Sequence, residues 1–280
     1  MSSLSGKKLI IHADDVGMCH TVNTATIKAF REGIVTSCSL MMPCPWVLEV
    51  AEQLKEEEYD YGIHSTLNSE WIYYKWRPVA DNVPSLVDDY GYLLRDPLET
   101  VKKGLAEHVK REIEEQVKKS FKMGLKPSHL DTHMGTVYMR RDFLHAYLDI
   151  AEKYNLIPLT MKLNEQAYNE LRKRGLELDK ETRERLINLP FPKLDKLITE
   201  IPGKTLHGRI KFFEEILKSL KENTLTMIIV HLGLETEELK AIIGTGYYRR
   251  VLDFKLVTST EAKKLLEEYN IELVEWKDVK

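Results

Sequence analysis

Features that would assign this chain of 280 residues to several common protein classes are scarce or absent. Its three cysteines, Cys19, Cys38 and Cys44, are odd in number and include no C-x-x-C pair, so we predict reduced thiols and no disulfide framework. No apolar run is long enough to cross a bilayer, and residues 1–8 lack the apolar segment of a signal peptide. We therefore expect a cytoplasmic protein without a membrane partner.

Neither sign of charge is in large excess. The chain has 41 lysines and arginines against 44 aspartates and glutamates, a formal net charge of −3. This balance lacks the basic surface typical of nucleic-acid-binding proteins, so we predict no nucleic-acid partner. No Gly-x-Ser-x-Gly motif is present either, which disfavours a serine nucleophile.

Apolar, β-branched runs alternate with helical patterns along most of the chain. Such repeats predict a parallel sheet with helical crossovers. With seven or eight units, we predict an α/β fold of the TIM-barrel-like (β/α) barrel type, as a single domain over residues 1–280. Strands are expected at 9–13, 35–42, 61–67, 128–134, 157–163, 225–231 and 271–276. Helices are expected at 21–32, 45–58, 98–123, 142–154, 165–200 (broken near Pro190 and Pro192), 209–221 and 260–269.

Titratable side chains follow several of the expected strands. In a barrel, functional residues lie at the carboxyl ends of the strands, so these side chains should meet at one rim. Three of them alternate along residues 129–133 and therefore share one face of their strand. The set comprises Asp14, Asp15, His64, His129, Asp131, His133 and His231.

Taken singly, most of these residues have an ordinary structural explanation. An Asp pair often caps a helix or forms a turn, and a lone histidine at a strand end is usually a hydrogen-bonded structural residue. Segment 129–133 is more informative, because three titratable groups on one strand face are costly to bury. Together the residues predict a site for a divalent cation, suited to metal-assisted hydrolysis with a carboxylate as base and a histidine as acid.

Five segments, in the same order, resemble the sequence blocks of the YdjC-like carbohydrate deacetylases. The first includes the run Ile-His-Ala-Asp-Asp-Val-Gly, and the third ends in His-Leu-Asp-Thr-His. The likeness extends over most of the chain. The segments are 11–17 with Asn23 and 33–41, then 62–67, 126–133, 231–233 and 249–259.

The resemblance implies a barrel related to polysaccharide deacetylases. It implies hydrolytic removal of acetyl groups from N-acetylated amino sugars or short chitin-type oligosaccharides, so the expected partner is a small carbohydrate. Carried over by position, Asp15, His64 and His133 would bind one divalent metal ion, with Mg²⁺ or Zn²⁺ as the leading candidates.

The resemblance also implies the remaining roles. Asp14 would be the general base and His231 the general acid. His129 and Asp131 would orient the metal ligands from behind, and His129 is also the nearest competitor for a ligand role.

The chain departs from the family pattern at four places. His12 stands where the family usually has Asn, Met134 follows the third block in place of further histidines, residues 160–162 lack an arginine, and Leu232 replaces a proline. These changes leave the expected metal ligands intact but affect the surface that would face the substrate.

Two other functions stay open at this point. Another divalent-metal barrel enzyme, a phosphoesterase or sugar isomerase, would want a basic group near the metal, and only Lys162 is suitably placed. A non-catalytic sugar-binding protein would be favoured by loss of Asp14 or of a metal-type histidine, and neither is lost. The aromatic-rich segment 68–97 could stack on sugar rings or pack against a second copy, so a homodimer is also open.

Overall fold

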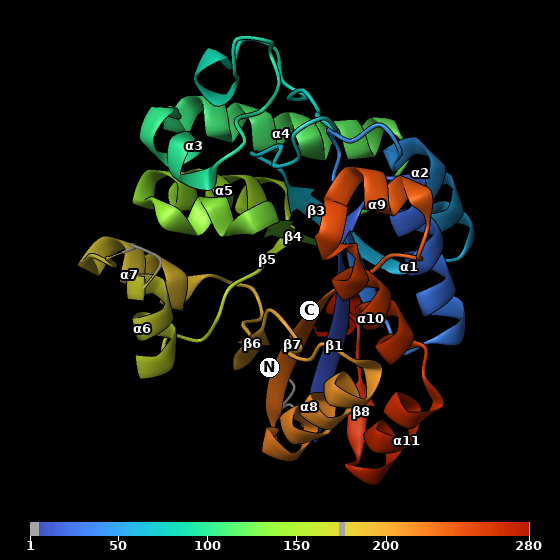
Figure 1. The fold of residues 1–280 in the computed structure, drawn as a ribbon. Coiled ribbons are helices and arrows are strands. Elements are labelled where there is room, and N and C mark those ends of the chain that lie inside the picture. Colours follow the sequence, from blue (N-terminus) through green and yellow to red (C-terminus); the bar gives the residue numbers. More distant parts are fainter. Residues whose placement is uncertain (1–5, 174–176, 280) are drawn as a thin grey trace.

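A parallel β-sheet forms the centre of the computed structural model, which describes residues 6–173 and 177–279 (Figure 1). The described residues form eight strands, hydrogen-bonded in the order β5-β4-β3-β2-β1-β7-β6, with β8 paired to β1. Their bounds are β1 (Lys7–Val16), β2 (Ser37–Leu40), β3 (Asp60–Ser65), β4 (His129–Thr132), β5 (Ile157–Pro158), β6 (Lys196–Ile198), β7 (Thr224–His231) and β8 (Ile271–Leu273).

The sheet curls until its two edges meet. Met161, just after β5, forms an isolated parallel bridge with Leu194, just before β6. The Leu194 amide donates to the Thr160 carbonyl at 2.9 Å, and the Lys162 amide donates to the Leu194 carbonyl at 2.8 Å. The predicted α/β barrel with seven or eight parallel strands is therefore confirmed.

Helices cover the outside of the sheet. The pair α6 and α7 lies beyond β5 and β6, at the left of Figure 1. No described helix is long and apolar enough to cross a membrane. The bounds are α1 (His20–Glu32), α2 (Val47–Glu56), α3 (Pro97–Lys103), α4 (Ala106–Lys122), α5 (Arg141–Tyr154), α6 (Glu165–Lys173), α7 (Lys180–Asn188), α8 (Leu206–Ser219), α9 (Glu237–Ile243), α10 (Tyr247–Val257) and α11 (Thr260–Glu268).

Alternation along β1 separates the two sides of the sheet. Leu9 and Ile11 are fully buried in the large apolar cluster that includes the covering helices. Ile10 belongs instead to a second apolar cluster, together with Met227 and Trp276. Ile10 therefore faces the barrel interior, and the interior residues that follow it toward the end of the strand are polar.

Several predicted boundaries are wrong. The helix expected at 98–123 is two helices, because the backbone turns at Gly104 between α3 and α4. The expected helical region 165–200 ends in the strand β6, and residues 174–176 lie outside the described part. β6 was missed because three residues give too short a pattern to identify. The cysteine prediction is confirmed, since all three thiols are free and buried.

Candidate active site

Three strand ends bring Asp15, His64 and His133 together. Asp15 Oδ1 lies 3.0 Å from His133 Nδ1 and 3.4 Å from His64 Nε2. All three side chains are buried, and one ligand atom from each lies within 4.8 Å of the others. A carboxylate and two imidazoles in this arrangement can hold a divalent cation.

A second carboxylate holds the far nitrogen of each histidine. His64 Nδ1 lies 2.7 Å from Asp131 Oδ1, and His133 Nε2 lies 2.9 Å from Glu70 Oε2. With the proton on the nitrogen that faces this carboxylate, the other nitrogen presents its lone pair toward Asp15, as metal-binding histidines usually do.

Protons compete with a cation for these same histidines. Burial alone would lower the pKa of His133, but the carboxylates of Glu70 and Asp15 raise it to about 9. The pKa of His64 is also raised, because Asp131 and Asp14 outweigh the effect of burial. A metal ion must displace these protons, so its affinity will fall as the pH falls.

Arg250, on α10, fixes the orientation of Asp15. It donates a hydrogen bond to Asp15 Oδ2 at 2.5 Å, which leaves Oδ1 facing the two histidines. Burial alone would raise the pKa of Asp15, yet the charges of Arg250 and His133 hold it well below its ordinary value. Asp15 is therefore a carboxylate at neutral pH.

A backbone irregularity lets two consecutive residues, Asp14 and Asp15, reach the same site. Neighbouring residues in a regular strand point to opposite faces. Here the register of β1 against β2 shifts between Ala13 and Val16, and Asp15 has a left-handed φ of 64°. This bulge turns both carboxylates toward the rim.

Asp14 is the acid of the site whose carboxylate accepts the fewest hydrogen bonds. It is buried, and its Oδ1 has no hydrogen-bond partner among the described residues. Its Oδ2 lies 3.9 Å from His64 Nε2 and 3.9 Å from His231 Nε2. Burial raises the pKa of Asp14 to about 7, although His64 acts in the opposite direction. A carboxyl group with this pKa can accept or release a proton near neutral pH.

His231 lies beside Asp14 at the rim, because the two residues are partners in register on the neighbouring strands β1 and β7. Its side chain is 39% exposed, and its backbone amide donates to Asp253 Oδ2 at 3.1 Å. Loss of solvation lowers the pKa of His231 to about 4, and the charge of Arg250 acts in the same direction. The ring is therefore neutral at pH 7.

Asp131 and His129, expected to lie together behind the ligands, take different positions. Asp131 bridges His64 and His12, with its Oδ2 2.9 Å from His12 Nε2. His129 forms none of the described hydrogen bonds to the three candidate ligands; its Nδ1 lies 2.7 Å from Ser128 Oγ. His12, His129 and Asp131 form a second group with metal-type spacing, further inside the barrel.

Gly62 on β3 makes room for His129. A Cβ atom at this position would lie 2.3 Å from the His129 ring, a distance that side-chain atoms do not adopt. Burial also lowers the pKa of His129 to about 4, so the ring is neutral. A neutral, enclosed ring suits the interior of the barrel below the site.

The sequence analysis missed Glu70 and Arg250, which contact the candidate ligands directly. Arg250 lies within the fifth family-like segment, so its likeness to the family pattern could have identified it as a site residue. Glu70 lies near the start of the aromatic-rich segment 68–97, and no motif in the neighbouring sequence identifies it as a site residue. In that segment Trp76 is buried, with its ring centroid 6.4 Å from that of His133, whereas Tyr73 is 96% exposed.

The model of the YdjC-like protein family matches residues 8–268. The chain belongs to the YdjC-like family. It is 28% identical to a carbohydrate deacetylase of Thermoanaerobacter pseudethanolicus, with 98% of this chain and 100% of the relative aligned. It is 31% identical to a carbohydrate deacetylase of Thermus thermophilus, over 95% of this chain and 92% of the relative. The resemblance found in the sequence is thereby confirmed, and these relatives agree with an amide-cleaving hydrolase.

A crystal structure from Enterococcus faecalis, described as that of a cellobiose-phosphate cleavage protein, has the same fold. The TM-score is 0.80 at 24% identity, over 98% of this chain and 99% of the other. This likeness supports the architecture of the barrel.

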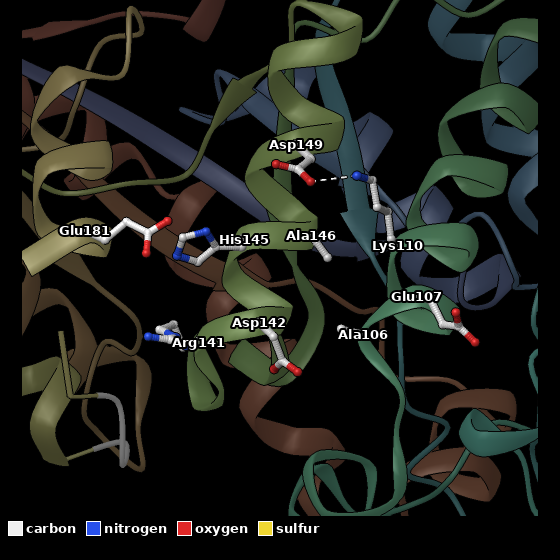
Figure 2. A pocket seen from close by; sticks show the side chains of 9 residues that line it. All are labelled: Ala106, Glu107, Lys110, Arg141, Asp142, His145, Ala146, Asp149 and Glu181. Atoms are coloured by element: carbon white, nitrogen blue, oxygen red, sulfur yellow. Dashed lines mark hydrogen bonds and ion pairs between the residues drawn. The ribbon is translucent and has the colours of Figure 1, made fainter. Parts of the chain in front are cut away.

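A separate surface pocket, of about 300 Å³, lies between α4, α5 and α7 (Figure 2). Two of its charged groups are paired with each other: Lys110 Nζ lies 2.6 Å from Asp149 Oδ2, along the dashed line of Figure 2. His145 Nε2 lies 2.9 Å from Thr182 Oγ1. These contacts explain the residues as structural.

Proposed function

We propose that this protein is a metal-dependent hydrolase that removes acetyl groups from N-acetylated amino sugars or short chitin-type oligosaccharides. The observation that carries the proposal is the buried carboxylate of Asp14, which accepts none of the described hydrogen bonds and lies beside the group formed by Asp15, His64 and His133. The family membership and the names of the relatives support a carbohydrate amide as the substrate.

Asp15, His64 and His133 would hold one divalent cation, with Mg²⁺ or Zn²⁺ as the leading candidates. Asp15 Oδ1 and one nitrogen of each histidine converge, while Arg250, Asp131 and Glu70 occupy the remaining polar atoms. When bound, such an ion polarises the amide carbonyl and makes water a better nucleophile.

Asp14 is the proposed general base. Its unpartnered oxygen can accept a proton from the attacking water, and a pKa raised to about 7 by burial suits that role. Three histidines flank the carboxylate without a described hydrogen bond to it: His12 Nε2 lies 3.4 Å from Oδ1, and His64 Nε2 and His231 Nε2 each lie 3.9 Å from Oδ2. Asp14 therefore retains free acceptor capacity.

His231 is the proposed general acid. The proton that water loses to Asp14 is the one that the departing nitrogen needs, so amide and water yield acetate and amine without another reactant. His231 is neutral at first, so the proton that Asp14 takes from water must pass to His231 before it reaches the departing nitrogen, and the lowered pKa of the ring then favours its release. Asp14 and His231 are partners in register on neighbouring strands, which suits this transfer.

The alternative enzyme classes gain no support. Lys162, the basic group that a phosphoesterase or isomerase would use, forms an ion pair with Asp195 at 2.7 Å. Arg250 is engaged by Asp15.

The test is acetate release from N-acetylglucosamine and from N,N′-diacetylchitobiose. Activity should disappear after chelation and return with Mg²⁺ or Zn²⁺. Asp14→Asn should keep its metal and lose about 10²- to 10⁴-fold in rate, the usual contribution of a general base. His64→Ala should lose metal, as measured by elemental analysis of the folded protein. Activity that survives chelation would refute the metal dependence of the reaction. Loss of metal from Asp14→Asn would instead make Asp14 a metal ligand.

A further inference from the structure

A large cavity adjoins the two proposed proton-transfer groups. Its volume is about 430 Å³, and Asp14 and His231 form part of its wall. The cavity extends from the ends of β4 and β7 to α6 and α7, which contribute Leu171 and Leu186. Its size falls within the range of small-molecule sites, about 300–1,000 Å³.

The cavity wall is mostly aliphatic. Leucines at 144, 159, 163, 171, 186 and 197 line it together with Met161 and Ile229. Polar groups are few, and one of them, Thr160 Oγ1, is buried without a hydrogen-bond partner among the described residues. A sugar ring placed against the aliphatic part of this wall would leave hydroxyl groups without partners, at a cost of about 1–3 kcal/mol each.

We propose that this cavity binds the acyl chain of the substrate, and that the enzyme removes acyl groups longer than acetyl in preference to acetyl. The inference rests on the proposed amide hydrolysis. A water-sized group takes about 30 Å³, so a cavity of about 430 Å³ could hold a chain of several methylenes.

The position and the aliphatic wall of the cavity favour the acyl chain over the sugar or its aglycone. The chain is bonded to the carbonyl carbon, which the water activated by Asp14 attacks, and Asp14 lines the cavity. His231, which acts on the nitrogen, also lines it, so the aliphatic wall is what favours the acyl chain over the sugar. The sugar is bonded to the nitrogen, and an aglycone lies further away, beyond the ring. Glu70 and Trp76, from the segment 68–97, contact His133 outside the cavity lining.

The experiment measures kcat/KM for glucosamine carrying acetyl, butanoyl, hexanoyl or octanoyl groups. Burial of a methylene is worth about 0.8 kcal/mol, so kcat/KM should rise by up to about fourfold per methylene until the cavity is full. Ala167→Phe, on the cavity side of α6, should lower the ratio of the hexanoyl to the acetyl value. Asn169→Phe places the same side chain on the exposed side of that helix and should leave the ratio unchanged.

A second variant, Leu197→Gln, adds a polar group to the wall and should also lower the ratio if Ala167→Phe does not fold. A preference for acetyl in the wild type would overturn the inference while leaving the proposed function intact. A kcat/KM that rises with alkyl glycosides of N-acetylglucosamine, but not along the acyl series, would assign the cavity to the aglycone. That result would also overturn the inference. No hydrolysis of any N-acyl sugar would refute the proposed function itself.

Discussion

Asp14 and Asp15 differ more than two adjacent identical residues usually do. The bulge in β1 brings both to the rim, but Arg250 binds only Asp15, and burial raises the pKa of Asp14 alone. One member is thus a permanently charged candidate ligand and the other a titratable candidate base. The division of roles follows from contacts with α10 and the barrel interior.

His231→Ala tests the proposed acid. An amine leaves poorly unless it gains a proton, whereas the leaving group of an aryl acetate needs little help. We expect the variant to lose about 10²- to 10⁴-fold in kcat/KM on an N-acyl sugar and less than about tenfold on the aryl ester. Equal losses on the two substrates would mean that His231 binds substrate or supports the metal centre.

The candidate ligands could be predicted because their signals are local. Asp15 and His64 follow short apolar runs, His133 ends a segment with three alternating titratable groups, and the family-like segments contain all three. Glu70 could not be predicted as a partner of His133, because the two residues are 63 positions apart and only the folded chain brings them together. The roles of Asp14, Asp15 and the histidines stay predictions until they are tested.

At the scale of elements, a buried acid on α4, Glu112, is one of the groups that hold the long segment 68–97 to the barrel. Glu112 Oε1 accepts a hydrogen bond from the Val79 amide at 2.9 Å, and Oε2 accepts one from the Ala80 amide at 2.7 Å. Gln116 donates to the same carboxylate at 2.8 Å. These contacts make the segment an ordered part of the molecule despite its lack of long helices or strands.

Glu112 should make the stability of the protein depend on pH. Burial raises its pKa from 4.5 to about 7, in spite of the three donors. Below pH 4.5 the group is protonated in both states. Between pH 4.5 and 7 the unfolded state ionises first, so the free energy of unfolding should fall by about 3 kcal/mol as the pH rises through this window.

Glu112→Gln should remove this component, as measured by urea unfolding at pH 5 and pH 7.5. The matched control is Glu107→Gln on the same helix, where the side chain is 71% exposed. An unchanged pH dependence in Glu112→Gln would show that the carboxylate is already ionised in the folded protein at pH 5.

Element types were easier to predict than element ends. The 13-residue helix α1 and the 8-residue strand β7 were recognised from long periodic patterns. β6 and the break at Gly104 depend on tertiary contacts: Leu194 must meet Thr160 to close the barrel, and Gly104 lies close to Phe143 of α5. The partners in both contacts are far apart in the sequence, so neither contact could be predicted from the neighbouring residues.

At the scale of the whole molecule, the barrel interior is divided along its axis. Ile10, Met227 and Trp276 fill the end where the strands begin. Polar side chains follow toward the other end, through His12 and Asp131 to the candidate metal centre. The apolar end stabilises the fold, and the polar end performs the proposed chemistry. That residues 1–280 make up a single domain stays a prediction.

Residues from the last part of the chain complete the apolar end. β8 pairs with the first residues of β1, and Trp276, which follows it, is fully buried. The Trp276 ring lies 5.6 Å from that of His129, centroid to centroid, and its backbone amide donates to Asp60 Oδ2 at 3.2 Å. The barrel therefore cannot be fully packed until the carboxyl-terminal segment has joined it.

Trp276→Ala should consequently lower the free energy of unfolding by about 3–5 kcal/mol, the usual cost of truncating a buried aromatic side chain. Trp46→Ala is the control, because Trp46 is 38% exposed and should cost much less. In the folded Trp276→Ala protein, metal content should be retained and kcat/KM should change far less than stability, since the candidate ligands lie at the opposite end of the strands. Urea unfolding, elemental analysis and initial rates measure the three quantities. Loss of metal with little loss of stability would show instead that Trp276 acts on the site through His129 and His12.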